Sequence, residues 1–221
     1  LTLNNDVTIN SQSVLNVNGN ITRNANITFK SNDLGTAQFG KFTGGTISGS
    51  GEVTVERFVP KSNRAFRYIS SPVNTSGTIN DNLQEGATTA SSTPNPKPGF
   101  GTHITGDKNA NRGFDATSTG NPSMFKWNED STKPVWEAIS NTDNNTLSVG
   151  EAYALMIRGD RSTSLNSNTI VGPATTLRFT GTLKTGNKQV ADANLSGTSG
   201  NYNLIANPYQ AIVDAKSLLQ G

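Results

Sequence analysis

The residues best suited to chemistry lie close together, between His103 and Asp115. The stretch DKNANRGFD (107–115) places Asp107, Asn109, Asn111 and Asp115 at positions 1, 3, 5 and 9. Side-chain oxygens at this spacing can converge on calcium, which prefers six to eight oxygen ligands. An EF-hand-type loop has glycine at position 6, where this stretch has arginine. The same residues are also typical of a surface turn in which Asn and Asp bond their own backbone, so both interpretations stay open.

Catalytic chemistry has few candidate residues in this chain. Cysteine is absent and His103 is the only histidine, which excludes disulfides, thiolate chemistry and a zinc site made of His and Cys. A Ser-His-Asp triad would depend on His103, which we expect to be a hydrogen-bonded structural residue. Glu52 and Glu56 are too far apart along one strand to form a glycosidase pair. No catalytic residue is therefore predicted.

Two motifs suggest binding. Trp127 and Trp136 flank a polar turn, and their flat faces could form a platform for sugar rings, although tryptophan is also common in cores. Residues 158–160 spell Arg-Gly-Asp, an integrin-recognition tripeptide, but a strand-ending turn explains the string equally well.

Composition restricts the possible partners. The net charge is only +2, from 18 Lys and Arg against 16 Asp and Glu, which does not favour nucleic acid binding. No apolar run approaches the roughly 18 residues of a membrane helix, so the chain is not expected to span a membrane. With 28 Thr, 28 Asn and 22 Gly, the sequence is typical of a protein of strands and turns.

Residues 1–58 predict a ladder of very short strands. Apolar residues recur in pairs two positions apart, so that each pair lies on one face of a strand. The pairs are Leu1/Leu3, Val7/Ile9, Leu15/Val17, Ile27/Phe29 and Val53/Val55. Asn and Gly between them tolerate positive φ at corners, which favours a short β-solenoid (β-helix) with Asn stacked between coils. A hairpin meander is the alternative, and so few coils would be the end or cap of a longer array.

Residues 59–221 predict a second domain, a β-sandwich or jelly-roll-like module. Several short strands alternate with loops rich in Pro, Asn and Ser. One short helix is expected at the C-terminus, where Asn207 could cap it, Pro208 suits the first turn, and Ile212, Ala215 and Leu219 share a face. The predicted fold class is thus all-β with one C-terminal helix.

Seven strings carry a family resemblance, and they occur in a fixed order. They are GEVTVERFVP (51–60), FRYISSPV (66–73), INDNLQEGA (79–87), PGFGTHITG (98–106), GFDA (113–116), LSVGEAYALMIRGDRS (147–162) and NLIANPYQAIVDA (203–215). Residues 45–221 in this way resemble modules of very large secreted cell-surface proteins of Bacteroidetes, typically exported by the type IX secretion system. The resemblance implies an extracellular or cell-surface location and the type IX machinery as a partner. Related sequences continue past NPYQAIVDA, so we expect the module to be truncated at its C-terminus.

The same resemblance implies a modification and a range of functions. Asp130-Ser131-Thr132 fits the short sequon on which this phylum places O-glycans, so Ser131 is a predicted glycosylation site. We expect a non-catalytic stalk or adhesion module that binds surface polysaccharide or other cell-surface proteins. The alternatives are an accessory domain of a secreted polysaccharide-degrading enzyme and a lyase-type catalytic solenoid, which the few coils and scattered carboxylates oppose.

Overall fold

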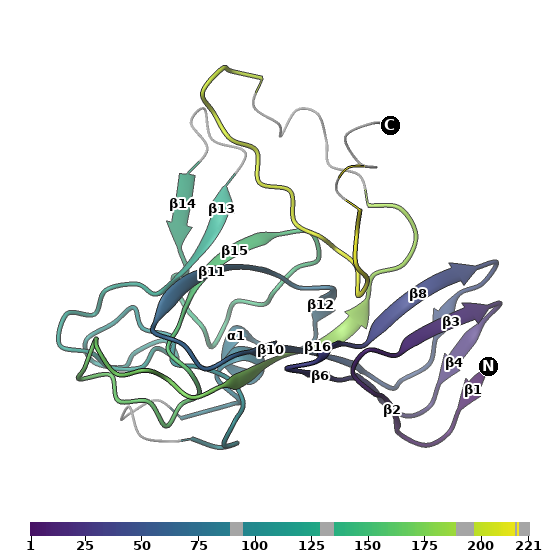
Figure 1. The fold of residues 1–221 in the computed structure, drawn as a ribbon, viewed down its shortest axis with the longest axis horizontal. Coiled ribbons are helices and arrows are strands. Elements are labelled where there is room, and N and C mark those ends of the chain that lie inside the picture. Colours follow the sequence, from purple (N-terminus) through teal and green to yellow (C-terminus); the bar gives the residue numbers. More distant parts are fainter. Residues whose placement is uncertain (89–94, 129–134, 189–196, 215, 217–221) are drawn as a thin grey trace.

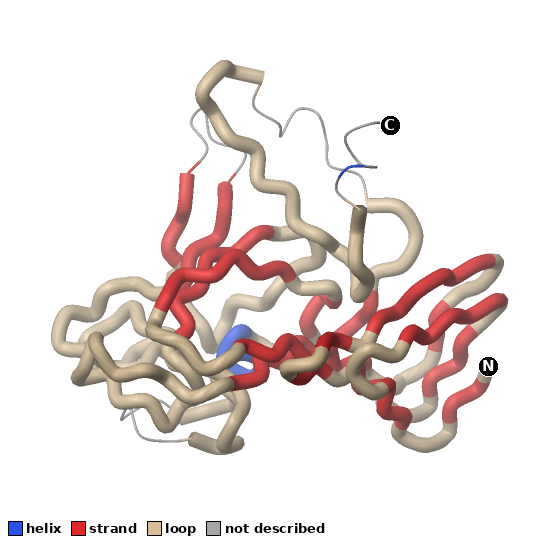
Figure 2. The backbone as a smooth tube through the Cα atoms, viewed as in Figure 1, coloured by secondary structure: helices blue, strands red, loops and turns tan. Residues whose placement is uncertain are grey.

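The computed structural model describes residues 1–88, 95–128, 135–188, 197–214 and 216. Within these residues the chain consists almost wholly of strands and loops, which confirms the all-β prediction (Figure 1) (Figure 2). The one helix bounded in this part of the chain, α1 (Ile79–Leu83), begins with a capping box: the Thr78 hydroxyl accepts the Asp81 N–H, and the Asp81 carboxylate accepts the Thr78 N–H. No helix in the described ranges has the length and apolar character needed to cross a membrane.

The N-terminal part of the chain forms three stacks of parallel strands. The stacks are β1 (Thr2–Leu3), β4 (Ile21–Arg23) and β9 (Ile47–Ser48); β2 (Val7–Ile9), β5 (Ile27–Phe29) and β10 (Val53–Val59); and β3 (Val14–Asn18) with β8 (Gln38–Thr43). In the second stack Val7 lies opposite Ile27, and Ile27 lies opposite Val53. A hairpin meander would pair successive strands antiparallel, so that alternative is wrong for these strands.

Asparagine and aspartate side chains connect successive layers of the stacks at their corners. Asp6 Oδ1 accepts the Asn26 N–H at 2.9 Å, and Asn26 Oδ1 accepts the Glu52 N–H at 2.9 Å. Asn20 Oδ1 likewise accepts the Thr46 N–H at 3.0 Å. These bonds satisfy backbone donors just before the strands begin, which accounts for part of the asparagine excess.

Strand β10 joins this ladder to the rest of the molecule. One edge of β10 pairs in parallel with β5, and the other pairs antiparallel with β16 (Thr175–Leu183), which also pairs with β12 (Val73–Thr75). The resulting sheet has the order β12-β16-β10-β5-β2 and runs across the predicted domain boundary at residues 58 and 59. The division into domains 1–58 and 59–221 stays a prediction.

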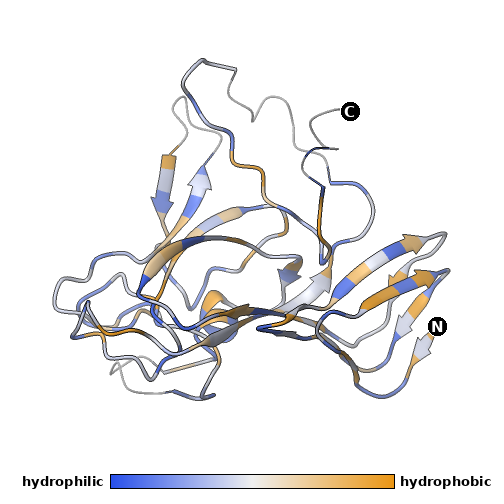
Figure 3. Ribbon diagram, viewed as in Figure 1, coloured by the Kyte–Doolittle hydropathy of each residue, from blue (hydrophilic) through white to orange (hydrophobic). Residues whose placement is uncertain are grey.

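A second, antiparallel sheet has the order β11-β15-β13-β14. Its strands are β11 (Ala65–Ser70), β15 (Ala152–Ile157), β13 (Met124–Asn128) and β14 (Val135–Ala138). Buried side chains from both sheets and from α1 form one apolar cluster, to which Phe29, Val55, Leu83, Leu155 and Phe179 belong. Apolar and polar residues alternate along many of the strands (Figure 3). Two sheets that share a core in this way are sandwich-like.

The predicted C-terminal helix does not begin where the sequence suggested. Residues 207–214 are not helical, because Asn207 bonds locally instead: its Oδ1 accepts the Tyr209 N–H at 3.0 Å and its Nδ2 donates to the Ala211 carbonyl at 2.8 Å. The segment then joins the ladder, since the Phe39 N–H donates to the Gln210 carbonyl at 2.6 Å. Ala215 and Leu219, two residues of the predicted helical face, lie outside the described residues.

A corner bond of the ladder can be tested by Asn26→Ala. Loss of the bond from the Glu52 N–H is expected to lower the free energy of unfolding by about 1 kcal/mol, measured by urea denaturation. Asn63→Ala is the matched control, because Asn63 is exposed and its substitution is expected to stay within about 0.5 kcal/mol of wild type. Equal stability of the two variants would contradict a structural role for the corner asparagines.

Candidate functional site

The last residue of the 107–115 stretch, Asp115, belongs to a buried network of charged and polar side chains. Asp115 is fully buried and forms a two-point ion pair with Arg161, in which Nη1 lies 2.7 Å from Oδ2 and Nη2 lies 2.6 Å from Oδ1. Arg161 is 2% exposed and comes from the turn after β15. This planar, two-point geometry is the strongest arrangement available to a carboxylate and a guanidinium.

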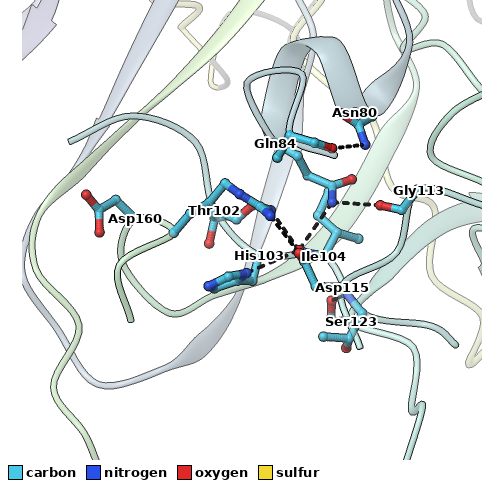
Figure 4. Close-up of polar contacts among 12 residues, drawn as sticks. Asn80, Gln84, Thr102, His103, Ile104, Gly113, Asp115, Ser123 and Asp160 are labelled. Carbon is cyan, nitrogen blue, oxygen red and sulfur yellow. Dashed lines mark hydrogen bonds and ion pairs between the residues drawn. The ribbon is translucent and has the colours of Figure 1, made fainter. Parts of the chain in front are cut away.

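Three further groups surround the same carboxylate (Figure 4). Gln84 Nε2 donates to Asp115 Oδ2 at 3.2 Å, the Ile104 N–H donates to it at 3.0 Å, and His103 Nδ1 lies 3.2 Å from it. Burial alone would raise the pKa of Asp115, but hydrogen bonding to His103 and Arg161 lowers that pKa below its ordinary value. The carboxylate is therefore held in its charged form inside the core.

This arrangement suits a structural role, in which non-covalent bonds hold several segments together, better than catalysis. Gln84 is the C-cap residue of α1, and it brings the helix to a carboxylate that also binds the 102–104 segment and Arg161. His103 is completely buried, so a substrate could reach its imidazole only if the core opened. The network thus joins a helix and three loop segments through one charge.

The four predicted calcium ligands are divided between two environments. Asp107 Oδ1 accepts the Asn109 N–H at 2.6 Å and the Asn111 side-chain amide at 3.3 Å, which forms the Asx-type turn considered as the alternative. Both oxygens of Asp115 instead face Arg161. In the part of the chain that is described, no three His, Asp or Glu side chains form a metal-binding group. The residues therefore do not fit a four-ligand site that includes Asp115, and calcium binding by the other three residues stays a prediction.

The Arg-Gly-Asp string is packed against the protein. Asp160 is 5% exposed and accepts the Gly99 N–H at 2.7 Å and the Ser162 N–H at 2.9 Å. Arg158 is also buried. The tripeptide therefore forms a structural turn, and its two charges are not displayed to an outside partner.

The two predicted ligand-binding tryptophans do come together. Trp127 on β13 lies directly opposite Trp136 on β14, and their ring centroids are 5.1 Å apart in an edge-to-face arrangement. Tyr68 on β11 stacks on Trp136 with a centroid distance of 5.5 Å and an interplanar angle of 16°. Both tryptophans are half-buried, whereas Tyr68 is 71% exposed.

Small residues on the intervening strand allow these rings to meet. Ala154 on β15 pairs with Tyr68 on one side and with Phe125 on the other. Phe66 and Phe125 also approach each other across β15, with centroids 5.8 Å apart. We call Phe66, Tyr68, Phe125, Trp127 and Trp136 the aromatic face. The two tryptophans alone were predicted to bind a ligand, although the two-residue spacings of Phe66 with Tyr68 and of Phe125 with Trp127 put each pair on one side of a strand.

Ser131, the predicted glycosylation site, lies outside the described residues. It belongs to the segment between β13 and β14, which carry the two tryptophans. Glycosylation of Ser131 stays a prediction.

Comparison with known proteins assigns no family to the chain. No protein-family model, curated protein or solved structure matches it. Any function must therefore be argued from the chain itself.

The buried ion pair can be tested by Arg161→Met. The substitution leaves the Asp115 carboxylate in the core without its counter-charge, so the free energy of unfolding is expected to fall by about 3–5 kcal/mol. Lys108→Met is the control, because Lys108 is exposed and its substitution also removes one positive charge. The free energies of unfolding are measured by denaturant titration, and an equal decrease in both variants would contradict a stabilising role of the ion pair.

The lowered pKa of Asp115 makes stability depend on pH in a defined direction. Because the folded-state pKa lies below the unfolded value of about 3.9, the stabilising contribution is complete above about pH 5 and is lost as the pH falls. The free energy of unfolding should therefore decline more steeply with acidification in the wild type than in Asp115→Asn. Parallel pH profiles of the two proteins would rule out this contribution.

Proposed function

We propose that this chain is a non-catalytic module of a large bacterial cell-surface or secreted protein and that it binds polysaccharide on its aromatic face. The observation that carries the proposal is the exposed stack of Tyr68 on Trp136 beside Trp127. Exposed clusters of large apolar side chains are uncommon on isolated domains and typically mark binding sites.

The chemistry of the aromatic face suits a sugar ligand. Flat aromatic rings pack well on the C–H faces of pyranose rings, and the tryptophan and tyrosine rings also offer N–H and O–H donors at their edges. The rings are supported by a regular sheet rather than by loops alone, which favours a fixed binding geometry. Weak binding of a repeated polymer is sufficient for adhesion, because many copies can act together.

The N-terminal strands support a role as a stalk. Three parallel stacks with asparagine bonds between layers are the features expected of a short β-solenoid, and we propose that residues 1–58 adopt that fold. Solenoids grow by adding similar layers, which makes them suitable spacers in long surface proteins. Residues 59–221 would then form the sandwich-like binding part.

The non-catalytic assignment is supported by the position of the only histidine, which is buried against Asp115. An extracellular location and export by type IX secretion rest on the resemblance of the strings between residues 51 and 215. An accessory domain of a polysaccharide-degrading enzyme is the alternative, and it would use the same aromatic face.

The proposal is tested with a panel of neutral and acidic polysaccharides by affinity electrophoresis. Trp136→Ala is expected to weaken binding about tenfold, equivalent to about 1.4 kcal/mol, because it removes the ring that both Tyr68 and Trp127 contact. Leu34→Ala is the control, since Leu34 is an exposed apolar residue of the β6 (Ser31–Asn32) to β7 (Gly35–Thr36) hairpin. Failure of every polysaccharide to bind the wild type, or equal binding by Trp136→Ala, would refute the proposal.

A further inference from the structure

A cavity of about 430 Å³ lies where the C-terminal segment meets the strand ladder. Its walls include residues 36–38, which run from the end of β7 to the start of β8, and residues 210–213 of the C-terminal segment. Figure 1 shows this yellow segment turning beside the ladder, and the bond from the Phe39 N–H to the Gln210 carbonyl fixes it there. The cavity is separate from the side chains of the aromatic face.

Arg57 lines this cavity from an unusual position on β10. Alternation along the strand puts Arg57 on the same side as Val53 and Val55, which are buried in the core. Its partner on β16 is Leu177, another buried apolar residue. A cation is thus held on the core-facing side of the sheet.

The guanidinium of Arg57 has no carboxylate partner among the described residues. Its bond there runs from Nη1 to the neighbouring Glu56 carbonyl at 3.1 Å, although a guanidinium carries five N–H donors. The Glu56 carboxylate lies on the other side of the strand and pairs with Lys30 at 2.8 Å. Burial lowers the pKa of Arg57 to about 10, which reflects the cost of desolvating the charge.

Amide side chains complete the lining of the cavity. Gln210 is 2% exposed, and its Oε1 has no donor within the described part of the chain. Gln38 Oε1 accepts the Ile212 N–H at 3.2 Å, and its amide nitrogen makes no hydrogen bond to any residue that the structure describes. Unpaired charges and unpaired buried acceptors are both costly, and one ligand with an anionic group and a hydroxyl donor would satisfy both.

We infer that this cavity binds the carboxylate of a sugar acid through Arg57, with the surrounding amides bonding the hydroxyl groups. The planar guanidinium matches a carboxylate in two-point geometry. The volume lies within the range of about 300–1,000 Å³ that is typical of small-molecule sites. Arg57 alone indicates a ligand with a carboxylate group. The choice of a sugar acid over other carboxylates rests on the proposed polysaccharide function.

Glucuronate, glucose and acetate serve as probes of the whole chain in thermal unfolding and calorimetric titration. Glucuronate is expected to raise the melting temperature, because a ligand that binds only the folded state stabilises it. Glucose and acetate are expected to give much smaller shifts at the same concentration. Arg57→Met is expected to weaken glucuronate binding at least tenfold and to raise the melting temperature of the ligand-free protein, since an apolar side chain suits this position. Lys61→Met, which removes an exposed charge, should bind as wild type does.

The outcomes separate this site from the aromatic face. Unchanged glucuronate affinity in Trp136→Ala, together with loss in Arg57→Met, supports the cavity site even if no polysaccharide binds the aromatic face. The inference is overturned if glucuronate gives no shift, if it binds Arg57→Met as tightly as wild type, or if acetate stabilises the protein as strongly as glucuronate. Should Arg57→Met fail to fold, Arg57→Lys keeps the charge without the two-point geometry and must still weaken binding.

Discussion

The structure depends on the double pairing of strand β10. This strand of seven residues must satisfy a parallel register with β5 and an antiparallel register with β16 at the same time. Val55 consequently lies between Phe29 and Phe179, so that the interior of the ladder and the core of the sandwich-like part are continuous. The pairing with β5 ends at Phe29, opposite Val55, and the next position on that side of β10, Arg57, lines the cavity.

A charged network supports the interior of a molecule whose loops are long. Residues 99–123 contain no regular strand, and a segment of that kind needs fixed contacts to hold one conformation. Asp115 supplies them by binding Arg161, the Ile104 backbone and the cap of α1. The molecule in part reverses the usual placing of charged groups at the surface and apolar groups in the core. An ion pair is fully buried, while several large aromatic rings lie on the outer side of a sheet.

Local patterns can be recognised in the sequence, whereas the partners that the fold brings together from distant positions cannot. Apolar pairs such as Val7 with Ile9 and Ile27 with Phe29 predicted short strands at the correct places, because side-chain alternation is a local property. The predicted C-terminal helix does not begin at Asn207, because Asn207 forms a local turn and the Gln210 carbonyl accepts the Phe39 N–H, which only the fold brings near. Asp115 had the right spacing for a cation, but its counter-charge is 46 residues away in the chain. Tyr68 on β11 reaches Trp136 on β14 across both β15 and β13, a contact that depends on the strand order and not on local spacing.

The β6–β7 hairpin shows that one layer of the ladder can contain more residues than the other while their strands still pair. The second layer carries this additional hairpin between β5 and β8, whereas the first passes from β2 to β3 without one, yet Val14 still lies opposite Gln38. Insertions at this corner therefore leave the stacked strands in place. The length of chain between two stacked strands is therefore free to differ from one layer to the next, as a scaffold that carries loops of different size requires.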